Sequence, residues 1–247
     1  MAAGSNEPRF AVENWAALAS GLSTQQEWLS WFREPGPLER EFAPELSWMP
    51  AGLRRRVSPL GRAALNVLAA CQPDEPCPVV FASRYGDLDA IAGLLTQLHR
   101  EGGVSPMAFS LSVHNSAVGV YSIARKDRVT TTSIAARTDL AEAAFFEALG
   151  CLASGIPRVL VVCCEDCIPR PYRVEGKDGG FRYAWACCLR AQSAGGFALM
   201  AATSGPVDMC FPSRVDHPSL RALAFLVSDE GASLASESGH YLWRRHA

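Results

Sequence analysis

The sequence predicts an α/β fold in which helices cover both faces of a mixed sheet of five or more strands. Three observations support this prediction. Strand-like and helix-like segments alternate through much of the chain. The stretch IPRVLVVCCED (156–166) is a continuous apolar run with an acidic end, the pattern of a strand covered on both faces. The 247 residues are 49% hydrophobic and 19% charged, which is enough apolar mass for a sizeable core.

Charge and the first residues argue against two classes of protein. The formal net charge is −2, so no basic field is available to attract nucleic acid. The opening MAAGSNEPRF has no apolar signal core, and no apolar run reaches the roughly 18 residues that a membrane helix needs. We therefore expect a soluble, cytoplasmic protein with no nucleic-acid partner and no membrane span.

The elements justify the fold in chain order, beginning with a part, 1–56, that we expect to be largely irregular. FAVENWAAL (10–18) predicts an opening strand or a short amphipathic segment. Ser23 is a candidate cap for a short helix over STQQEWLSWF. EPGPLEREFAPELSWMP (34–50) is rich in proline and predicts irregular surface chain.

Residues 57–166 carry the regular alternation. Gly102 and Gly103 end one helix, and Gly155 follows another as a C-cap. The predicted elements are a helix at 57–71, a strand at 79–82, a helix at 88–101, a small-residue helix after 114–115, a strand at 129–134, a helix at 139–153 and a strand at 156–166. This order favours a layered domain with helices on both faces of the sheet.

Residues 167–247 look different and predict a strand-rich tail of the same single domain (1–247). FRYAWACCLRAQ (181–192) and GGFALMAAT (195–203) are strand-like and predict a hairpin. HPSLRALAFLVSD (217–229) predicts a last short helix, and YLWRRHA ends the chain with exposed cations, which we interpret as a solvated tail.

Three stretches resemble the N-terminal half of the thiolase-fold β-ketoacyl synthases. They are VVFASRYGDLDAIAGLL, SPMAFSLSVHNSAVGVYSIA and VTTTSIAARTDLAEAAFFEALGCLASGIPRVLVVCCED. They are similar, in this order, to the family's strand–turn–helix, to its Pro-aromatic stretch before an Asn and a small-residue helix, and to its nucleophile turn. The chain is most similar to short ketosynthase-like proteins of aryl-polyene and related clusters, which resemble chain-length factors.

The resemblance implies a vacant nucleophile position. Ketosynthases need a cysteine where the strand turns into the helix, because the helix N-terminus favours the thiolate. Counting from Asn115 and from Gly155 places that position near Thr138, and no cysteine occurs from Gly119 to Gly150. The turn carries Ala135, Ala136, Arg137, Thr138 and Asp139. The supporting histidine motifs of the family's second half are also missing, so we expect no catalysis by this chain alone.

The resemblance also implies partners. The strand of Val129, Thr130, Thr131, Thr132, Ser133 and Ile134 would pair with a full-length ketosynthase, or with a second copy when that partner is absent. Met107, Ala108 and Phe109, followed by His114 and Asn115, match the region that reaches the partner's acyl tunnel. The implied function is that of a chain-length factor, with condensation performed by the partner. Arg54, Arg55, Arg56 and Arg62 form the densest basic patch, which predicts either a solvated helix start or a site for an acidic acyl carrier protein.

Two other interpretations stay open. One is a free-standing acyl-thioester enzyme that uses Thr138, Ser133 or a cysteine. The other is a metal or redox module built on Cys163, Cys164 and Cys167. The nine cysteines, an odd number with adjacent pairs inside apolar runs, favour buried thiols instead, so we expect no metal and no cofactor. We expect Glu142 to face solvent, Asp139 to be available as an N-cap carboxylate, and His114 and Asn115 to cap and hydrogen-bond within the fold.

Overall fold

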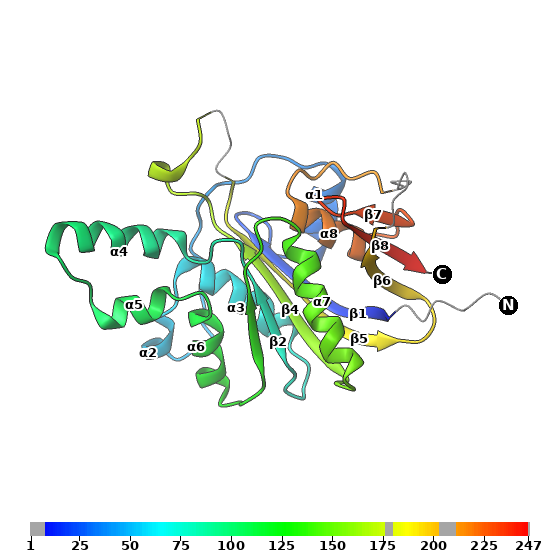
Figure 1. Cartoon of the computed structure of the whole chain (residues 1–247), viewed down its shortest axis with the longest axis horizontal. Coiled ribbons are helices and arrows are strands. Elements are labelled where there is room, and N and C mark those ends of the chain that lie inside the picture. The colour runs from blue at the N-terminus through cyan, green and yellow to red at the C-terminus, as the bar shows by residue number, and fades with distance from the viewer. Residues whose placement is uncertain (1–7, 176–179, 203–210, 247) are drawn as a thin grey trace.

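In the computed structural model, helices cover both faces of one mixed sheet (Figure 1). The structure describes residues 8–175, 180–202 and 211–246. Its strand order is β3-β2-β4-β5-β1-β6-β8-β7. The strands are β1 (Arg9–Ala19), β2 (Val79–Ala82), β3 (Thr131–Ile134), β4 (Arg158–Glu165), β5 (Tyr183–Gln192), β6 (Gly196–Ala201), β7 (Ser233–Ala235) and β8 (Tyr241–His246). β2 runs parallel to β3 and β4, and the other pairs are antiparallel. The predicted α/β fold with a mixed sheet is confirmed.

The helices follow the predicted pattern in the middle of the chain, except that Pro106–Ser112 forms a helix that was not predicted. They are α1 (Gln25–Arg33), α2 (Ala51–Arg54), α3 (Pro59–Cys71), α4 (Leu88–Glu101), α5 (Pro106–Ser112), α6 (Ser116–Arg125), α7 (Leu140–Ala153), α8 (Pro218–Val227) and the 3₁₀ turn η1 (Arg170–Tyr172). A search of the described ranges found no helix with the length and apolarity needed to cross a bilayer.

Two hydrophobic cores lie on opposite faces of the sheet. In β4, Val159 and Val161 point to the core that contains α7 and α8, whereas Leu160 and Val162 point to the core that contains α3 and α6. This alternation is the period of two that a strand imposes. β5 repeats it, with Trp185 on the α7 face and small alanines beneath α3. The apolar run at 156–166 is therefore buried on both faces, as predicted.

The N-terminal part contains more regular structure than its description as irregular implied. β1 lies inside the sheet between β5 and β6, and α1 follows it. The helix is capped by Thr24 and not by Ser23, because Thr24 and Glu27 form a reciprocal capping box. Glu27 also accepts a hydrogen bond from the Ser23 backbone. The proline-rich stretch 34–50 contains no helix or strand.

Two predictions for the tail are wrong. β5 and β6 do not form a hairpin with each other, because β1 lies between them and pairs with both. The cationic end is not a solvated tail either: it forms β8, which pairs with β6 and β7. The guanidinium of Arg245 donates to the carbonyls of Phe225 and Ser228 at the end of α8. Charge at the end of a chain does not by itself prevent strand pairing.

Candidate functional site

The corner between β3 and α7 is the predicted strand-to-helix junction. β3 ends at Ile134 and α7 begins at Leu140. Between them Asp139, at the N-cap position, has a left-handed backbone with φ of 54°. This conformation is uncommon for a residue other than glycine, and strained corners of this kind often occur at active sites. Here the corner contains no thiol, and the side chain of Thr138 is exposed.

Asp139 does not cap α7 with its side chain, contrary to expectation. Its Oδ1 accepts a 3.0 Å hydrogen bond from the backbone N–H of Ser238, just before β8. Asp139 is itself buried. The carboxylate at the strand-to-helix corner is therefore used to attach the C-terminal tail.

Glu142 is buried on the first turn of α7, so the prediction that it faces solvent is wrong. Its Oε1 accepts a 2.7 Å hydrogen bond from the indole Nε1–H of Trp243 on β8. Burial raises the pKa of the Glu142 carboxyl, and the bond from Trp243 opposes that rise. Apolar neighbours in the sequence suggested a solvent-facing polar position, but α8 and β8 cover this face of the helix.

The edge of the sheet is formed by β3, which is shorter than the predicted strand 129–134. Residues Thr131–Ile134 pair with β2, while Val129 and Thr130 precede the strand. In the described part of the chain, β3 has no strand on its other side. The side chains of Thr131 and Ser133 are exposed. An open edge with β-branched residues is suited to pairing with another chain.

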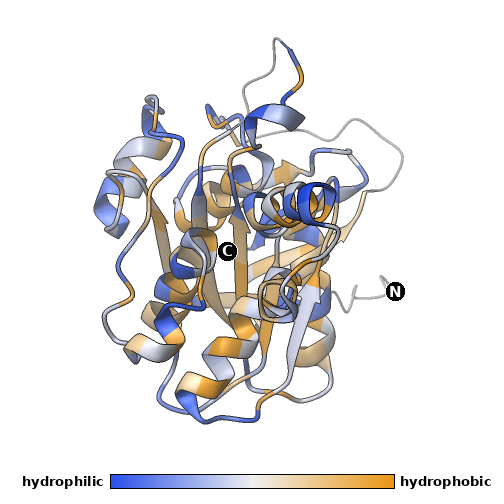
Figure 2. Ribbon diagram, turned by 90° about the vertical axis from the view of Figure 1, so that its left-hand side faces the viewer, coloured by the Kyte–Doolittle hydropathy of each residue, from blue (hydrophilic) through white to orange (hydrophobic). Residues whose placement is uncertain are grey.

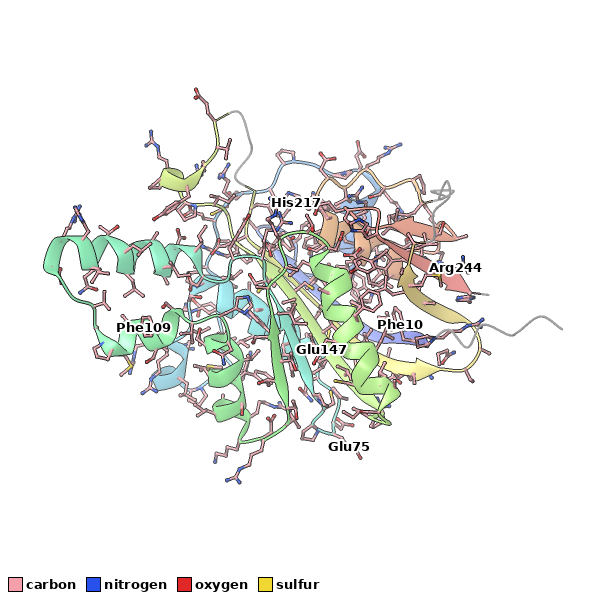
Figure 3. The ribbon with its side chains drawn as sticks, in the orientation of Figure 1. Phe10, Glu75, Phe109, Glu147, His217 and Arg244 are labelled. Carbon is pink, nitrogen blue, oxygen red and sulfur yellow. The ribbon has the colours of Figure 1, made fainter. Side chains whose placement is uncertain are left out.

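The predicted tunnel residues lie on an arm that leaves the body of the molecule. Figures 1 and 3 show α4 and α5 extending away from the sheet, with Phe109 far from the core residue Phe10. Met107 and Phe109 on α5 are each 58% exposed. An apolar groove of about 520 Å³ lies between the two helices. At its end His114 bonds through Nε2 to the carbonyl of Ser83 at 2.9 Å, so the predicted internal hydrogen bond is confirmed. Asn115 occupies the N-cap position of α6 without a side-chain bond.

A polar network holds the root of this arm. Arg182, almost fully buried, pairs with Asp166 at 2.9 Å and lies 3.7 Å from Asp89 on the first turn of α4. Glu165 accepts a 2.6 Å hydrogen bond from the backbone N–H of Arg84, in the turn after β2. Burial raises the pKa of Glu165 to about 7, and the nearby Arg84 opposes that rise. These bonds fix the turn from which α4 starts.

The described cysteines are free thiols, most of them buried. Eight are free, seven of them buried and Cys151 partly exposed; Cys210 lies outside the described residues. Burial raises the pKa of Cys163, Cys164 and Cys167, which disfavours the reactive thiolate. No group of three or more His, Cys, Asp or Glu residues in the described ranges has the arrangement of a metal site.

The basic patch lies beside α3. Arg54 ends α2, Arg55 and Arg56 are exposed in the connection, and Arg62 donates from Nε to the carbonyl of Val57. Arg54, Arg55 and Arg56 therefore precede α3, and Arg62 is the one of the four that lies on that helix.

Sequence reasoning missed the tail contacts of Asp139 and Glu142 and the apolar face of α4. The contacts join residues about 100 positions apart, so no local pattern signals them. The α4 face did have a signal, since Ile91, Leu94, Leu95 and Leu98 follow helical spacing. A helix with such an apolar stripe needs a surface to cover it.

Comparison with known proteins shows the same fold. The sequence model of the family described as "Beta-ketoacyl synthase, N-terminal domain" matches residues 28–244. One similar solved structure is "Ketosynthase (ApeO) in Complex with its Chain Length Factor (ApeC) from Xenorhabdus doucetiae". The matched chain is 26% identical, with a TM-score of 0.75 over 97% of this chain and 99% of that chain.

Two more distant structures share the fold alone. "The ishigamide ketosynthase/chain length factor" is 14% identical, with a TM-score of 0.60 over 78% of this chain and 66% of that chain. "AntDE:AntF (apo): type II PKS acyl-carrier protein in complex with its ketosynthase bound to the hexaketide" is 13% identical, with a TM-score of 0.60 over 79% and 70%. No match was found among curated proteins. Because the family match extends over most of the sequence, this chain belongs to the β-ketoacyl synthase N-terminal domain family.

Proposed function

We propose that this chain is a non-catalytic subunit that pairs with a full-length β-ketoacyl-acyl-carrier-protein synthase and shapes its acyl tunnel. This is the role of a chain-length factor in fatty-acid, aryl-polyene or polyketide synthesis. The observation that carries the proposal is the corner between β3 and α7, which keeps its strained geometry while its carboxylate is bound to Ser238. The 26% identical chain comes from a structure of a ketosynthase with its chain-length factor, which supports the same role.

The partner docks on β3 in this proposal. The outer edge of β3 offers backbone N–H and C=O groups that an antiparallel strand of the partner would satisfy. A homodimer through the same edge forms when the partner is absent. The condensation of malonyl-carrier-protein with an acyl chain takes place in the partner subunit.

The arm supplies the residues that set the length of the product. Met107, Ala108 and Phe109 lie on α5, and His114 and Asn115 follow it. Since Met107 and Phe109 extend from the molecule, they are available to enter the partner's tunnel. Large side chains there would close the tunnel, because overpacking is costly.

The acyl carrier protein docks on the basic patch of Arg54, Arg55, Arg56 and Arg62 in this proposal, by charge attraction. We place the chain in a reducing compartment, the cytoplasm, because the eight described cysteines are free thiols. No cofactor or metal takes part in its role.

Reconstitution tests the proposal. The chain and each full-length ketosynthase of its source genome are purified separately and together, then incubated with malonyl-carrier-protein and a radiolabelled acyl-thioester primer. Condensation is expected only when the chain and one ketosynthase are both present, with no acyl label on the chain. Stable label on Thr138, Ser133 or Cys151 of the isolated chain would favour the acyl-thioester enzyme. One zinc ion per chain, measured by elemental analysis, would favour the metal module.

A further inference from the structure

The helix α4 has no core of its own. None of its residues is buried, and the element that it contacts most is α5. Its apolar side chains nevertheless share one face, since Leu95 and Leu98 follow Ile91 at helical spacing. Leu95 is 52% exposed and Leu98 is 49% exposed. A helix gains most of its stability by burying such a face. The apolar face of α4 is left uncovered by the described residues.

Exposed apolar residues gather around the same arm. Among the described residues, eleven large hydrophobic side chains are exposed, and seven of them lie in the stretch 85–123. These seven are Tyr85, Leu95, Leu98, Met107, Phe109, Val113 and Ile123. Figure 2 views this end of the molecule and shows apolar segments of the arm beside polar ones. Large exposed apolar patches mark surfaces that bind a partner.

The groove between α4 and α5 is the hollow part of this surface. Its lining is apolar almost throughout, with Ile91, Leu94, Leu95 and Leu98 on one side and Phe109 and Val113 on the other. Its volume of about 520 Å³ accommodates large apolar side chains of a neighbouring protein. The groove is open along its length, because the leucines that line it are half-exposed.

The open edge of the sheet lies at the same end as the arm. β3 ends the sheet on the side from which α4, α5 and α6 extend (Figure 1). An unpaired strand edge is satisfied by another polypeptide strand, which supplies both donors and acceptors. A lipid or a free acyl chain would cover the groove and leave that edge unpaired. The occupant that covers both features is therefore a protein.

We propose that the apolar face of α4, formed by Ile91, Leu94, Leu95 and Leu98, binds the ketosynthase subunit; we call this face the clamp. Side chains of that subunit enter the α4–α5 groove. This inference rests on the proposed function. It adds Leu95 and Leu98 as residues that hold the heterodimer, a role separate from tunnel length. In the proposed heterodimer, pairing along β3 sets the register of the two subunits. The α4–α5 arm contributes most of the apolar area buried between them. The root network around Arg182 and Asp89 holds α4 in position for this contact.

A double substitution on α4 tests the clamp. Leu95→Gln with Leu98→Gln keeps good helix formers, and no residue of α4 is fully buried, so the chain should fold as before. The control is Arg100→Gln, at an exposed position about 180° around the helix axis from Ile91. Each variant is titrated against the ketosynthase that the wild-type chain binds, by calorimetry. Circular dichroism of each free chain reports its folding.

The double variant should bind the ketosynthase at least tenfold more weakly, while Arg100→Gln binds within twofold of the wild type. Affinity of the double variant within twofold of the wild type would overturn the clamp and leave the proposed function intact. Unchanged affinity with products of altered length would instead assign the groove to the acyl chain, which also overturns the clamp. If the wild-type chain binds no ketosynthase, the proposed function itself fails.

Discussion

The indole Nε1–H of Trp243 on β8 donates a 2.7 Å hydrogen bond to Oε1 of Glu142 on α7, and both residues are buried. The rings of Trp243 and Phe145 meet edge to face, with centroids 4.8 Å apart. These contacts join the helix that follows the β3–α7 corner to the C-terminal strand. The tail therefore covers one face of α7, together with α8.

Removing the indole donor should destabilise the chain. Trp243→Phe leaves the buried Glu142 carboxyl without this partner, at a cost of about 1–3 kcal/mol in the free energy of unfolding. Glu142→Gln keeps an acceptor and removes a buried charge, so it should cost less. Urea unfolding measures both, with Trp48→Phe at a partly exposed site as the control. If Trp243→Phe and Trp48→Phe lower the free energy of unfolding equally, the predicted contribution of the Trp243–Glu142 hydrogen bond is wrong.

Glu165 should make stability depend on pH. Its pKa is about 7 in the folded chain and near 4.5 when unfolded, so the folded state binds more protons between these values. The free energy of unfolding from this group therefore falls as pH rises from about 4.5 to about 7. Glu165→Gln should flatten that decline, because an amide does not titrate and still accepts from Arg84 N–H. Urea titrations at several pH values measure the slope. If the slope is as steep in Glu165→Gln as in the wild type, the Glu165 carboxyl is not the source of the pH dependence. Glu147→Gln, at an exposed site, serves as the control.

Arg245 should act as a C-terminal cap for α8. Its guanidinium donates to the carbonyls of Phe225, Ser228, Glu230 and Gly231 and lies over the rings of Phe197 and Phe225. Arg245→Met keeps the aliphatic stem and removes the donors, so the free energy of unfolding should drop by about 1.5–3 kcal/mol. Arg244→Met, at the exposed neighbour, is expected to have a smaller effect. Thermal unfolding compares the two, and the reverse ranking would refute the capping role.

The bulk of Phe109 should set product length in the reconstituted complex. Phe109→Ala opens space at the end of the partner's tunnel, so products should become longer by one or more two-carbon units. Phe109→Trp should shorten them. Mass spectrometry of carrier-bound products measures the distribution, with Tyr172→Ala, another exposed aromatic, as the control. If the length distribution of the products is the same for both Phe109 variants as for the wild type, Phe109 does not line the tunnel.

Among the described cysteines, few should react with thiol reagents at neutral pH. Seven of the described cysteines are buried, and burial raises the pKa of Cys71 and Cys77 to about 12. Cys151 is partly exposed, so it should be the described residue that reacts first. Mass spectrometry after brief alkylation, with Cys151→Ser as the control, locates the label. Rapid labelling of Cys163 or Cys164 would reopen the redox interpretation.

Local pattern predicted most elements in the middle of the chain, although it missed α5. The apolar run in β4 and the alternation of strands and helices from 57 to 166 depend on residues close in sequence, whose spacing reports which faces are buried. The lack of a cysteine from Gly119 to Gly150 is likewise read directly from the sequence. The strand at 129–134 was placed correctly, although β3 begins two residues later.

Tertiary structure alone decided where the tail goes. β1 separates β5 from β6, although 181–203 looks like a hairpin, because the pairing of a strand depends on which neighbours bury its faces. Glu142 is buried for the same reason: β8, about 100 residues later, supplies the donor that makes its burial tolerable. Sequence patterns report burial through local periodicity, whereas the partner of a buried polar group and the surface left open on α4 depend on long-range packing.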